Sequence, residues 1–235
     1  MKKIFSILLT AAVVLGFFAS CSDIPSPYEL AKVEGNGKTL PYKSANLNSG
    51  WTLIGVTADQ PWLQSSNFTQ ATGYQDWDGT GTKSNKEVEG YLVSPAFNTK
   101  SASGKVKISF DLTLRYTDRV PNWKNNHKLY VSKSYVGGEF DPDVWEQLDY
   151  TPQASTYSDW TLYPSGDIQI PEDFVNQENV RFAFYFYAPA SASTTWELEN
   201  FLIQEGEANA DGGEDEPVQP GGDSSKESPY TVAEA

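Results

Sequence analysis

The chain has 235 residues, of which 17 are lysine or arginine and 31 are aspartate or glutamate, giving a formal net charge of −14. Binding to a nucleic-acid backbone or to an anionic membrane surface needs a basic face, so this balance argues against both. Aromatic residues make up 14% of the chain, which is too many for a disordered protein. The single cysteine rules out a disulfide framework and a cysteine-based zinc site, and the single histidine argues against a cluster of histidine ligands.

The N-terminus has the features of a secretory signal. Lys2 and Lys3 precede an apolar run of 16 residues, 4–19, which is shorter than the roughly 20 residues of a transmembrane helix. The run ends in Phe18-Ala19-Ser20-Cys21, which resembles a bacterial lipobox with phenylalanine where leucine is usual. We therefore expect residues 1–20 to be a lipoprotein signal peptide and Cys21 to carry the lipid. An ordinary secretory signal is the alternative.

The residues after Cys21 bear on where the protein is displayed. Ser22-Asp23 resembles the short acidic export signals of Bacteroidetes surface lipoproteins, although a solvated linker explains the pair equally well. Stable anchoring takes more than one acyl chain, and bacterial lipoproteins carry three. The expected location is thus the outer membrane, with the protein lipid-anchored and facing the cell exterior. Residues 21–37 are polar and contain two prolines and two glycines, so we expect them to form a tether.

Residues 38–204 carry the pattern of an all-β domain. Short runs rich in β-branched and aromatic residues alternate with turn residues, and no stretch keeps a helical spacing of apolar residues for three turns. This pattern predicts a two-sheet antiparallel β-sandwich or jelly roll. The expected strands are 51–56, 90–93, 105–116, 128–132, 160–163, 167–170, 180–187 and 195–203.

Two of these runs show the alternation best. In 105–116 the even positions are apolar and the odd positions polar, which indicates one core face and one wet face. In 180–187 both faces are apolar or aromatic, so this strand is expected to lie centrally in its sheet.

The composition changes after Gln204. Residues 205–228 are mostly Gly, Pro, Asp, Glu and Ser, and cannot bury enough apolar surface to offset their ordering entropy. We expect a disordered acidic linker there. The last segment, 229–235, reads PYTVAEA and resembles the start of small OB-like domains that follow such linkers in Bacteroidetes lipoproteins. The expectation is a further domain beyond it, and a true acidic tail is the alternative.

Three segments together resemble one family. Residues 89–97 (EGYLVSPAF) look like the "WLISPAIDL" segment of choice-of-anchor J and cleaved-adhesin jelly rolls, which are relatives of MAM domains. Residues 106–111 (VKISFD) look like the next strand of that family, and 196–203 (WELENFLI) resemble its closing strand, "WYIDNVKI". Glu199 stands where the family has aspartate. The resemblance implies a β-sandwich used for adhesion or ligand binding at bacterial surfaces, but fold analogy does not identify a ligand.

The aromatic residues point to glycan binding. Aromatic planes pack on the faces of sugar rings, while carboxylates, amides and arginines bond the hydroxyls. Trp51, Trp145, Trp160 and Trp196 lie in alternating contexts and are expected in the core. Loop candidates outside the core include Trp62, Tyr74 and Arg119. If strands 105–116 and 180–187 are neighbours, their odd faces and two loop tryptophans form one surface, and the predicted ligand-binding residues are Trp77, Trp123, Asp111, Arg115, Arg181, Tyr185 and Tyr187.

Two further constellations have weaker claims. Glu197 and Glu199 share a strand face at a spacing that could suit a glycoside hydrolase, but Phe201 stands where such jelly-roll enzymes have a third acid. The family resemblance implies a structural Ca²⁺ with Glu199 and Asn200 among its ligands, and solvated or cross-strand-paired acids are the alternative. His127 lies in a polar turn with no partner for catalysis and is expected at the surface.

The sequence therefore predicts a cell-surface lipoprotein whose β-sandwich binds an extracellular ligand, above all a glycan, beside a polysaccharide uptake system. We expect no catalysis, no nucleic-acid partner and no cofactor beyond the calcium implied by the resemblance. The main alternative is an adhesion or structural spacer module that presents a further domain. A glycoside hydrolase is the weaker one.

Overall fold

The structure is a computed structural model that describes residues 37–154 and 160–208. The expected signal peptide, Cys21, the tether up to residue 36, most of the acidic linker and residues 229–235 lie outside these ranges. Within them, no helix has the length and apolar character needed to cross a bilayer. The regular elements of the described chain are β-strands and short 3-10 helices.

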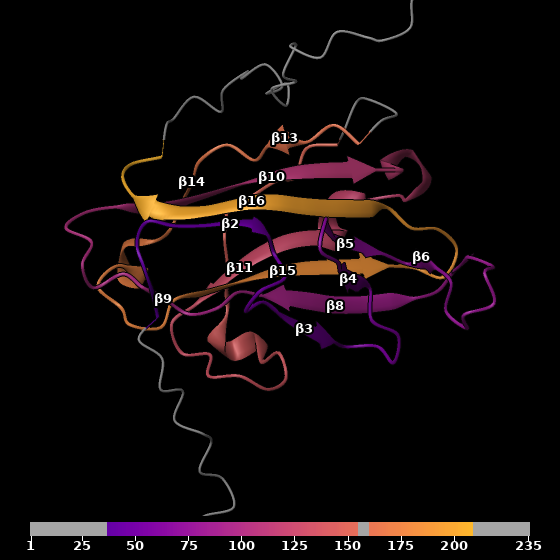
Figure 1. Ribbon diagram of the computed structural model, residues 1–235, viewed down its shortest axis with the longest axis horizontal. Helices are drawn as coiled ribbons and strands as arrows, with labels where there is room; N and C mark the ends of the chain where they lie inside the picture. The colour runs from indigo at the N-terminus through magenta and orange to yellow at the C-terminus, as the bar shows by residue number, and fades with distance from the viewer. Residues whose placement is uncertain (1–36, 155–159, 209–235) are drawn as a thin grey trace, which may run out of the picture. The chain divides into compact units, whose positions relative to one another are not determined.

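The larger of the two main sheets has seven strands in the described chain (Figure 1). Its path runs β13-β10-β16-β5-β4, with β14 also pairing β10 and β2 also pairing β16, and all pairings are antiparallel. β10 and β16 form its long centre. The strands are β2 (Tyr42–Asn46), β4 (Trp62–Gln64), β5 (Thr69–Thr72), β10 (Val106–Arg115), β13 (Tyr163–Pro164), β14 (Ile168–Gln169) and β16 (Thr195–Glu205).

The second sheet has five antiparallel strands in the order β12-β11-β15-β8-β3. They are β3 (Thr52–Gly55), β8 (Val88–Val93), β11 (His127–Ser132), β12 (Glu146–Gln147) and β15 (Arg181–Ala188). β1 (Lys38–Thr39) pairs with β9 (Phe97–Asn98), and β6 (Tyr74–Gln75) with β7 (Ser84–Asn85). The 3-10 helices are η1 (Thr117–Arg119), η2 (Trp123–Asn126), η3 (Pro142–Val144) and η4 (Glu172–Phe174).

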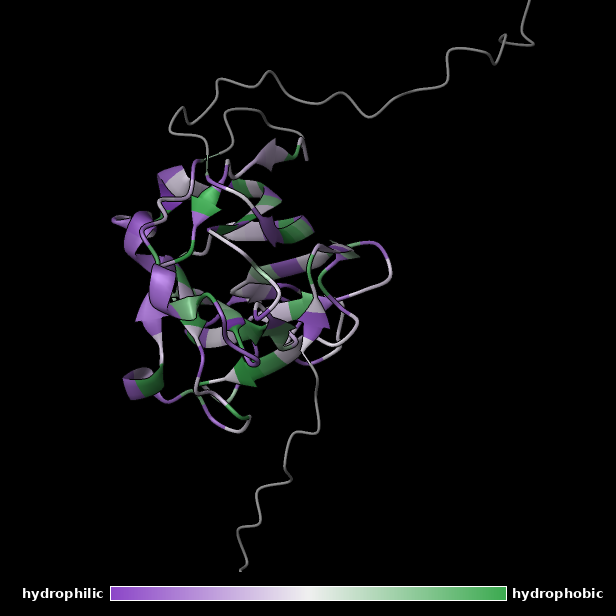
Figure 2. Ribbon diagram, turned by 90° about the vertical axis from the view of Figure 1, so that its left-hand side faces the viewer, coloured by the Kyte–Doolittle hydropathy of each residue, from purple (hydrophilic) through white to green (hydrophobic). Residues whose placement is uncertain are grey.

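The core lies between the two sheets, which confirms the predicted β-sandwich. The even positions of β10 and of β15 are buried, and the rings of Phe110 and Phe184 meet across the core at 4.9 Å. Trp51 and Trp196 join the same core through contacts with Phe184. In Figure 2 the strands change between hydrophobic and hydrophilic colours along their length, as this alternation requires. β15 lies between β11 and β8, so the expectation that it is central is confirmed.

A second, smaller aromatic cluster covers part of the outer face of the five-stranded sheet. The segment between β11 and β12 folds back so that Phe140 stacks on Tyr91, with ring centroids 3.5 Å apart, and on Trp145 at 5.2 Å. Tyr185 packs against the same Tyr91 ring at 5.1 Å. This part of the outer face is therefore occupied by the protein's own rings.

Three side chains lie where the sequence did not place them. Trp160, expected in the core, is 49% exposed, whereas the loop candidate Trp62 is only 1% exposed. His127, expected at the surface, is 1% exposed because β11 begins at that residue and turns it inward, beside Phe186 and Trp196. The other three tryptophans expected in the core, Trp51, Trp145 and Trp196, are buried as predicted.

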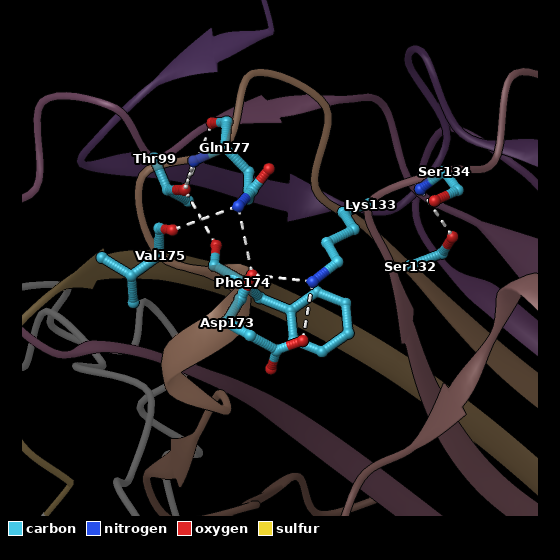
Figure 3. Close-up of polar contacts among 8 residues, drawn as sticks. All are labelled: Thr99, Ser132, Lys133, Ser134, Asp173, Phe174, Val175 and Gln177. Atoms are coloured by element: carbon cyan, nitrogen blue, oxygen red, sulfur yellow. Dashed lines mark hydrogen bonds and ion pairs between the residues drawn. The ribbon is translucent and has the colours of Figure 1, made fainter.

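One end of the sandwich, where β11 ends and β15 begins, is closed by its own polar contacts (Figure 3). Lys133 donates from Nζ to the carbonyl oxygen and the carboxylate Oδ2 of Asp173, at 3.1 and 2.7 Å. The hydroxyl of Thr99 donates to the carbonyl of Phe174 at 2.9 Å and accepts from the backbone N–H of Gln177 at 3.0 Å. The described chain also enters and leaves at this end, with β1 pairing β9 and β16 finishing beside the start of β10.

Candidate functional site

The opposite end of the sandwich holds a cavity of about 500 Å³. Three connections meet there, at the right of Figure 1: residues 73–87 between β5 and β8, residues 116–126 between β10 and β11, and residues 189–194 between β15 and β16. We call the cavity the end pocket. Its lining residues are Tyr74, Asn85, Tyr116, Arg119, Ser191, Ala192, Ser193 and Thr195.

Ser193 ties one wall of the end pocket to another. Its hydroxyl accepts from the backbone N–H of Gly73 at 2.7 Å and donates to the carbonyl of Thr194 at 2.6 Å. A Cβ on residue 73 would stand 2.9 Å from both the Cβ of Ala188 and the carbonyl oxygen of Lys86, closer than real Cβ contacts. The approach of the three segments therefore requires glycine at this position.

His127 lies behind the pocket wall and fixes a second pair of segments. Its Nδ1 is 2.7 Å from the carbonyl of Trp123, and its Nε2 is 2.9 Å from the hydroxyl of Thr194. A carbonyl only accepts, so Nδ1 carries the proton and the Nε2 of the neutral ring accepts from Thr194. Burial lowers the pKa of His127 to about 4, which keeps the ring neutral at physiological pH.

A row of alternating rings and cations begins at two lining residues of the pocket, Tyr116 and Arg119. The guanidinium of Arg115 lies 4.6 Å from the ring centroid of Trp160 and 4.9 Å from that of Tyr116, while the guanidinium of Arg119 lies 4.5 Å from the Tyr116 ring. These distances are within the range of cation–π attraction. Tyr116 has a φ of 62°, a left-handed backbone that a bulky residue rarely adopts. We call Trp160, Arg115, Tyr116 and Arg119 the ring–cation ladder.

The structure separates the predicted ligand-binding residues. Asp111 and Arg115 lie on β10 in the seven-stranded sheet, whereas Arg181, Tyr185 and Tyr187 lie on β15 in the five-stranded sheet. The expectation of one continuous surface is wrong, because the two strands face each other across the core and their polar faces point away from each other. Alternation along a strand shows which face is wet but not which sheet the strand joins.

The residues of this set on β15 already have partners within the domain. The guanidinium of Arg181 donates to the side chain of Asn179 and to the carbonyl of Ser94, each at 3.1 Å. The hydroxyl of Tyr187 donates to the carboxylate of Glu87 at 3.3 Å. Burial, with smaller contributions from Glu89, raises the pKa of the Tyr185 hydroxyl.

The two predicted loop tryptophans lie at the pocket end but do not line the pocket. Trp77 is half-buried in the β6–β7 hairpin, where its Nε1 donates to the carbonyl of Ser84 at 2.9 Å. Trp123 is half-buried in η2 and packs its edge against His127, with centroids 6.0 Å apart. Both rings also pack against the core, so each has a structural contact whatever its role in binding.

Three acids gather on the outer face of the seven-stranded sheet. Glu199 is the cross-strand partner of Asp111, and Glu197 is two residues away. Burial and the charge of Glu199 raise the pKa of Glu197 to about 7, and burial and Asp111 raise the pKa of Glu199. The side-chain amide of Asn200 donates to Asp111 at 2.7 Å. No group of three acidic, histidine or cysteine side chains among the described residues is arranged to hold a metal ion, and the calcium site stays a prediction.

Sequence reasoning found part of the end pocket. Tyr74, Arg119 and the neighbouring Arg115 belonged to the candidate sets, but Asn85, Tyr116, Ser191, Ala192, Ser193 and Thr195 did not. The missed residues are small or polar and come from three separate connections, so only their meeting in space marks them.

Comparisons with known proteins concern the fold. No family model matches the chain, and no curated protein matches its sequence. Among solved structures, the K1 cleaved adhesin domain of Lys-gingipain from Porphyromonas gingivalis W83 is similar, with 14% identity, a TM-score of 0.44, and coverage of 71% of this chain and 99% of that domain. The xylan-binding module CBM15 is similar with 14% identity, a TM-score of 0.38, and coverage of 71% and 99%. These likenesses do not assign a ligand to this chain.

Proposed function

We propose that this protein is a lipid-anchored surface protein that binds a glycan in the end pocket without chemical turnover. One observation carries the proposal: the pocket combines the rings of Tyr74 and Tyr116 with the amide of Asn85, the guanidinium of Arg119 and several hydroxyls. A sugar offers partly apolar ring faces and many hydroxyls, and this set of groups complements both. The volume of about 500 Å³ lies in the usual range for small-molecule sites.

The proposed absence of catalysis rests on where the acids lie. Hydrolysis of a glycosidic bond usually takes two carboxyl groups on either side of that bond. The described residues that line the end pocket include no Asp or Glu. Glu197 and Glu199 lie on the outer face of the seven-stranded sheet, with Asp111 beside them.

The cellular part of the proposal rests on the N-terminal sequence. The basic start, the apolar run and the small residues before Cys21 support lipidation at that cysteine. Together with the Ser22-Asp23 pair they support display on the exterior of the outer membrane, beside a polysaccharide uptake system. A spacer module that presents a further domain is the competing role, and it does not require a ligand in the end pocket.

The direct test is a glycan array followed by calorimetry on the mature chain and two variants. Tyr74→Ala removes a pocket ring that is 51% exposed, so little stability should be lost. Tyr185→Ala removes a ring from the outer face of the five-stranded sheet. We expect Tyr74→Ala to weaken binding about tenfold, in line with the ~1–3 kcal/mol found for stacked aromatic rings, and Tyr185→Ala to leave affinity unchanged. The opposite pattern would move the site to the five-stranded sheet, and no binding at all would favour the spacer role.

A further inference from the structure

In the described part of the chain, the arginines take no part in ion pairs. The chain has three arginines, at positions 115, 119 and 181. The ion pairs found among the described residues all use lysines, namely Lys86, Lys100, Lys105, Lys107 and Lys133. Arg181 is held by Asn179 and Ser94. The guanidinium groups of Arg115 and Arg119 form no ion pair in the described part of the chain and lie over the rings of Trp160 and Tyr116.

Within residues 37–154 and 160–208, neither of these two cations has a carboxylate partner, although the net charge of the chain is −14. Asp118 is adjacent to Arg119 in the chain, yet the two form no ion pair, and the carboxylates of Asp76 and Asp78 in the nearby hairpin accept instead from the backbone N–H groups of Gly81 and Thr80. An arginine that has no internal partner keeps its full set of donors for a ligand.

Ring contacts also leave these donors available. A guanidinium that contacts a ring through its flat face keeps its N–H groups free at its in-plane edge. Arg115 lies close to two rings, those of Tyr116 and Trp160, and Arg119 lies against Tyr116 on the pocket side. The in-plane edge of a guanidinium matches a carboxylate with two parallel hydrogen bonds. Because the ring contacts already restrain the side chain, less conformational entropy is lost when the ligand binds.

We propose that the end pocket selects an acidic glycan, one built from uronic-acid units, with Arg119 binding a sugar carboxylate. This inference rests on the proposed function and names the class of its ligand. Arg119 lines the pocket, so it meets the acid group directly. Arg115 is the cross-strand partner of the lining residue Thr195, and its guanidinium lies over the ring of Trp160. In this proposal the acidic-sugar site therefore extends beyond the pocket along the ring–cation ladder.

The test compares one oligosaccharide in two forms. A uronic-acid oligosaccharide and the same chain with its carboxyl groups reduced to alcohols differ only in charge. We expect the mature protein to bind the acidic form at least tenfold more tightly, because hydrogen bonds to a charged group are worth about 1.5–3 kcal/mol. The preference should shrink as sodium chloride is raised, since salt screens exposed charges.

Variants of Arg119 locate the effect. Arg119→Gln should lower affinity for the acidic form about tenfold and affinity for the reduced form by much less, because only the acidic form loses a charged hydrogen-bond partner. Arg119→Lys keeps the charge but not the paired donors, and should recover only part of the loss. The matched control is Lys43→Gln, which removes the same charge from an exposed position on β2 and should change neither affinity.

The outcomes separate this inference from the proposed function. Equal affinity for the acidic and reduced forms, or an acidic preference that survives Arg119→Gln, would overturn the acidic-glycan assignment while glycan binding stands. Tighter binding of a sulfated neutral glycan than of the uronic-acid chain would likewise overturn the carboxylate assignment. If neither form binds and the array is also empty, the proposed function itself fails.

Discussion

The Nε2 atom of His127 lies 2.9 Å from the hydroxyl of Thr194, which joins the first residue of β11 to the loop that forms one wall of the end pocket. The same ring holds the carbonyl of Trp123 through Nδ1. A single neutral imidazole therefore fixes the relative positions of two of the three connections around the pocket.

This arrangement predicts a loss of stability in acid. The pKa of His127 falls from about 6.5 in the unfolded chain to about 4 in the folded one, because burial disfavours the charged ring. The neutral ring contributes roughly 3 kcal/mol to the free energy of unfolding. This contribution is fully present above pH 6.5 and is lost as the pH falls towards 4. Urea unfolding of the wild type and of His127→Gln between pH 4 and 7 measures it. The slope of the wild type should exceed that of the variant, and parallel slopes would contradict the assignment.

Glu197 predicts the opposite trend at higher pH. Burial and the nearby charge of Glu199 raise its pKa to about 7, above the 4.5 of a free glutamate. The folded state therefore favours the protonated acid, and this contribution is present below pH 4.5 and lost as the pH rises to 7. We expect Glu197→Gln to melt at a higher temperature than the wild type at pH 8 and to lose that advantage at pH 4. Melting curves at both pH values check this, with Glu146→Gln at an exposed site as the control.

Truncation of two tryptophans should affect stability to very different degrees. Trp62→Ala removes a ring that is 1% exposed, and large-to-small changes of this kind cost about 3–5 kcal/mol. Trp160→Ala removes a ring that is 49% exposed and should leave the melting temperature within a few degrees of the wild type. Thermal unfolding of both variants decides the matter. A large drop for Trp160→Ala would show that its ring supports the fold rather than the ligand surface.

Gly73→Ala should disturb the end pocket through packing. The new methyl group would meet Ala188 and the carbonyl of Lys86 at 2.9 Å, and backbone must shift to relieve it. We expect lower stability together with weaker glycan binding, because Ser193 is bonded to the N–H of residue 73. Gly104→Ala serves as the control, since its nearest contact is the end of a flexible side chain at 4.0 Å. If Gly73→Ala binds glycan normally, the wall does not depend on this approach.

The proposed lipidation can be tested at the sulfur atom of Cys21. Cys21→Ser removes the only thiol of the chain, so the variant cannot receive an acyl chain at that position. We expect it to leave the detergent phase in phase-partitioning experiments, or to accumulate with its signal peptide uncleaved. Partitioning equal to that of the wild type, in a variant from which the signal peptide has been removed, would rule out the lipid anchor.

Some of this architecture could be predicted from the sequence, and the reasons differ by element. The alternation in residues 105–116 and 180–187 identified β10 and β15, because burial on one face leaves a period of two. β2 and β5 were missed, since YKSAN and TQAT hold too few apolar residues to show a period. Sheet membership depends on pairing between distant segments. For this reason the polar faces of β10 and β15 were wrongly joined.

The site was harder to predict than the fold. The residues next to Trp160 and His127 in the sequence do not indicate whether these side chains are buried. Only the packing of the two sheets leaves Trp160 exposed and buries His127. Tyr116 adopts a left-handed backbone conformation, which the sequence does not indicate because the position holds neither glycine nor asparagine. The pocket is assembled from three connections between strands, whose meeting depends on the sandwich as a whole.

The way the chain enters and leaves the domain sets the direction in which the pocket looks. Lys38 in β1 and Glu205 at the end of β16 both lie at the end of the sandwich that is opposite to the pocket. The residues that connect the domain to the rest of the chain, on the N-terminal and the C-terminal side, therefore join it at its closed end. The end pocket and the ring–cation ladder therefore lie at the end of the domain that is far from both Lys38 and Glu205.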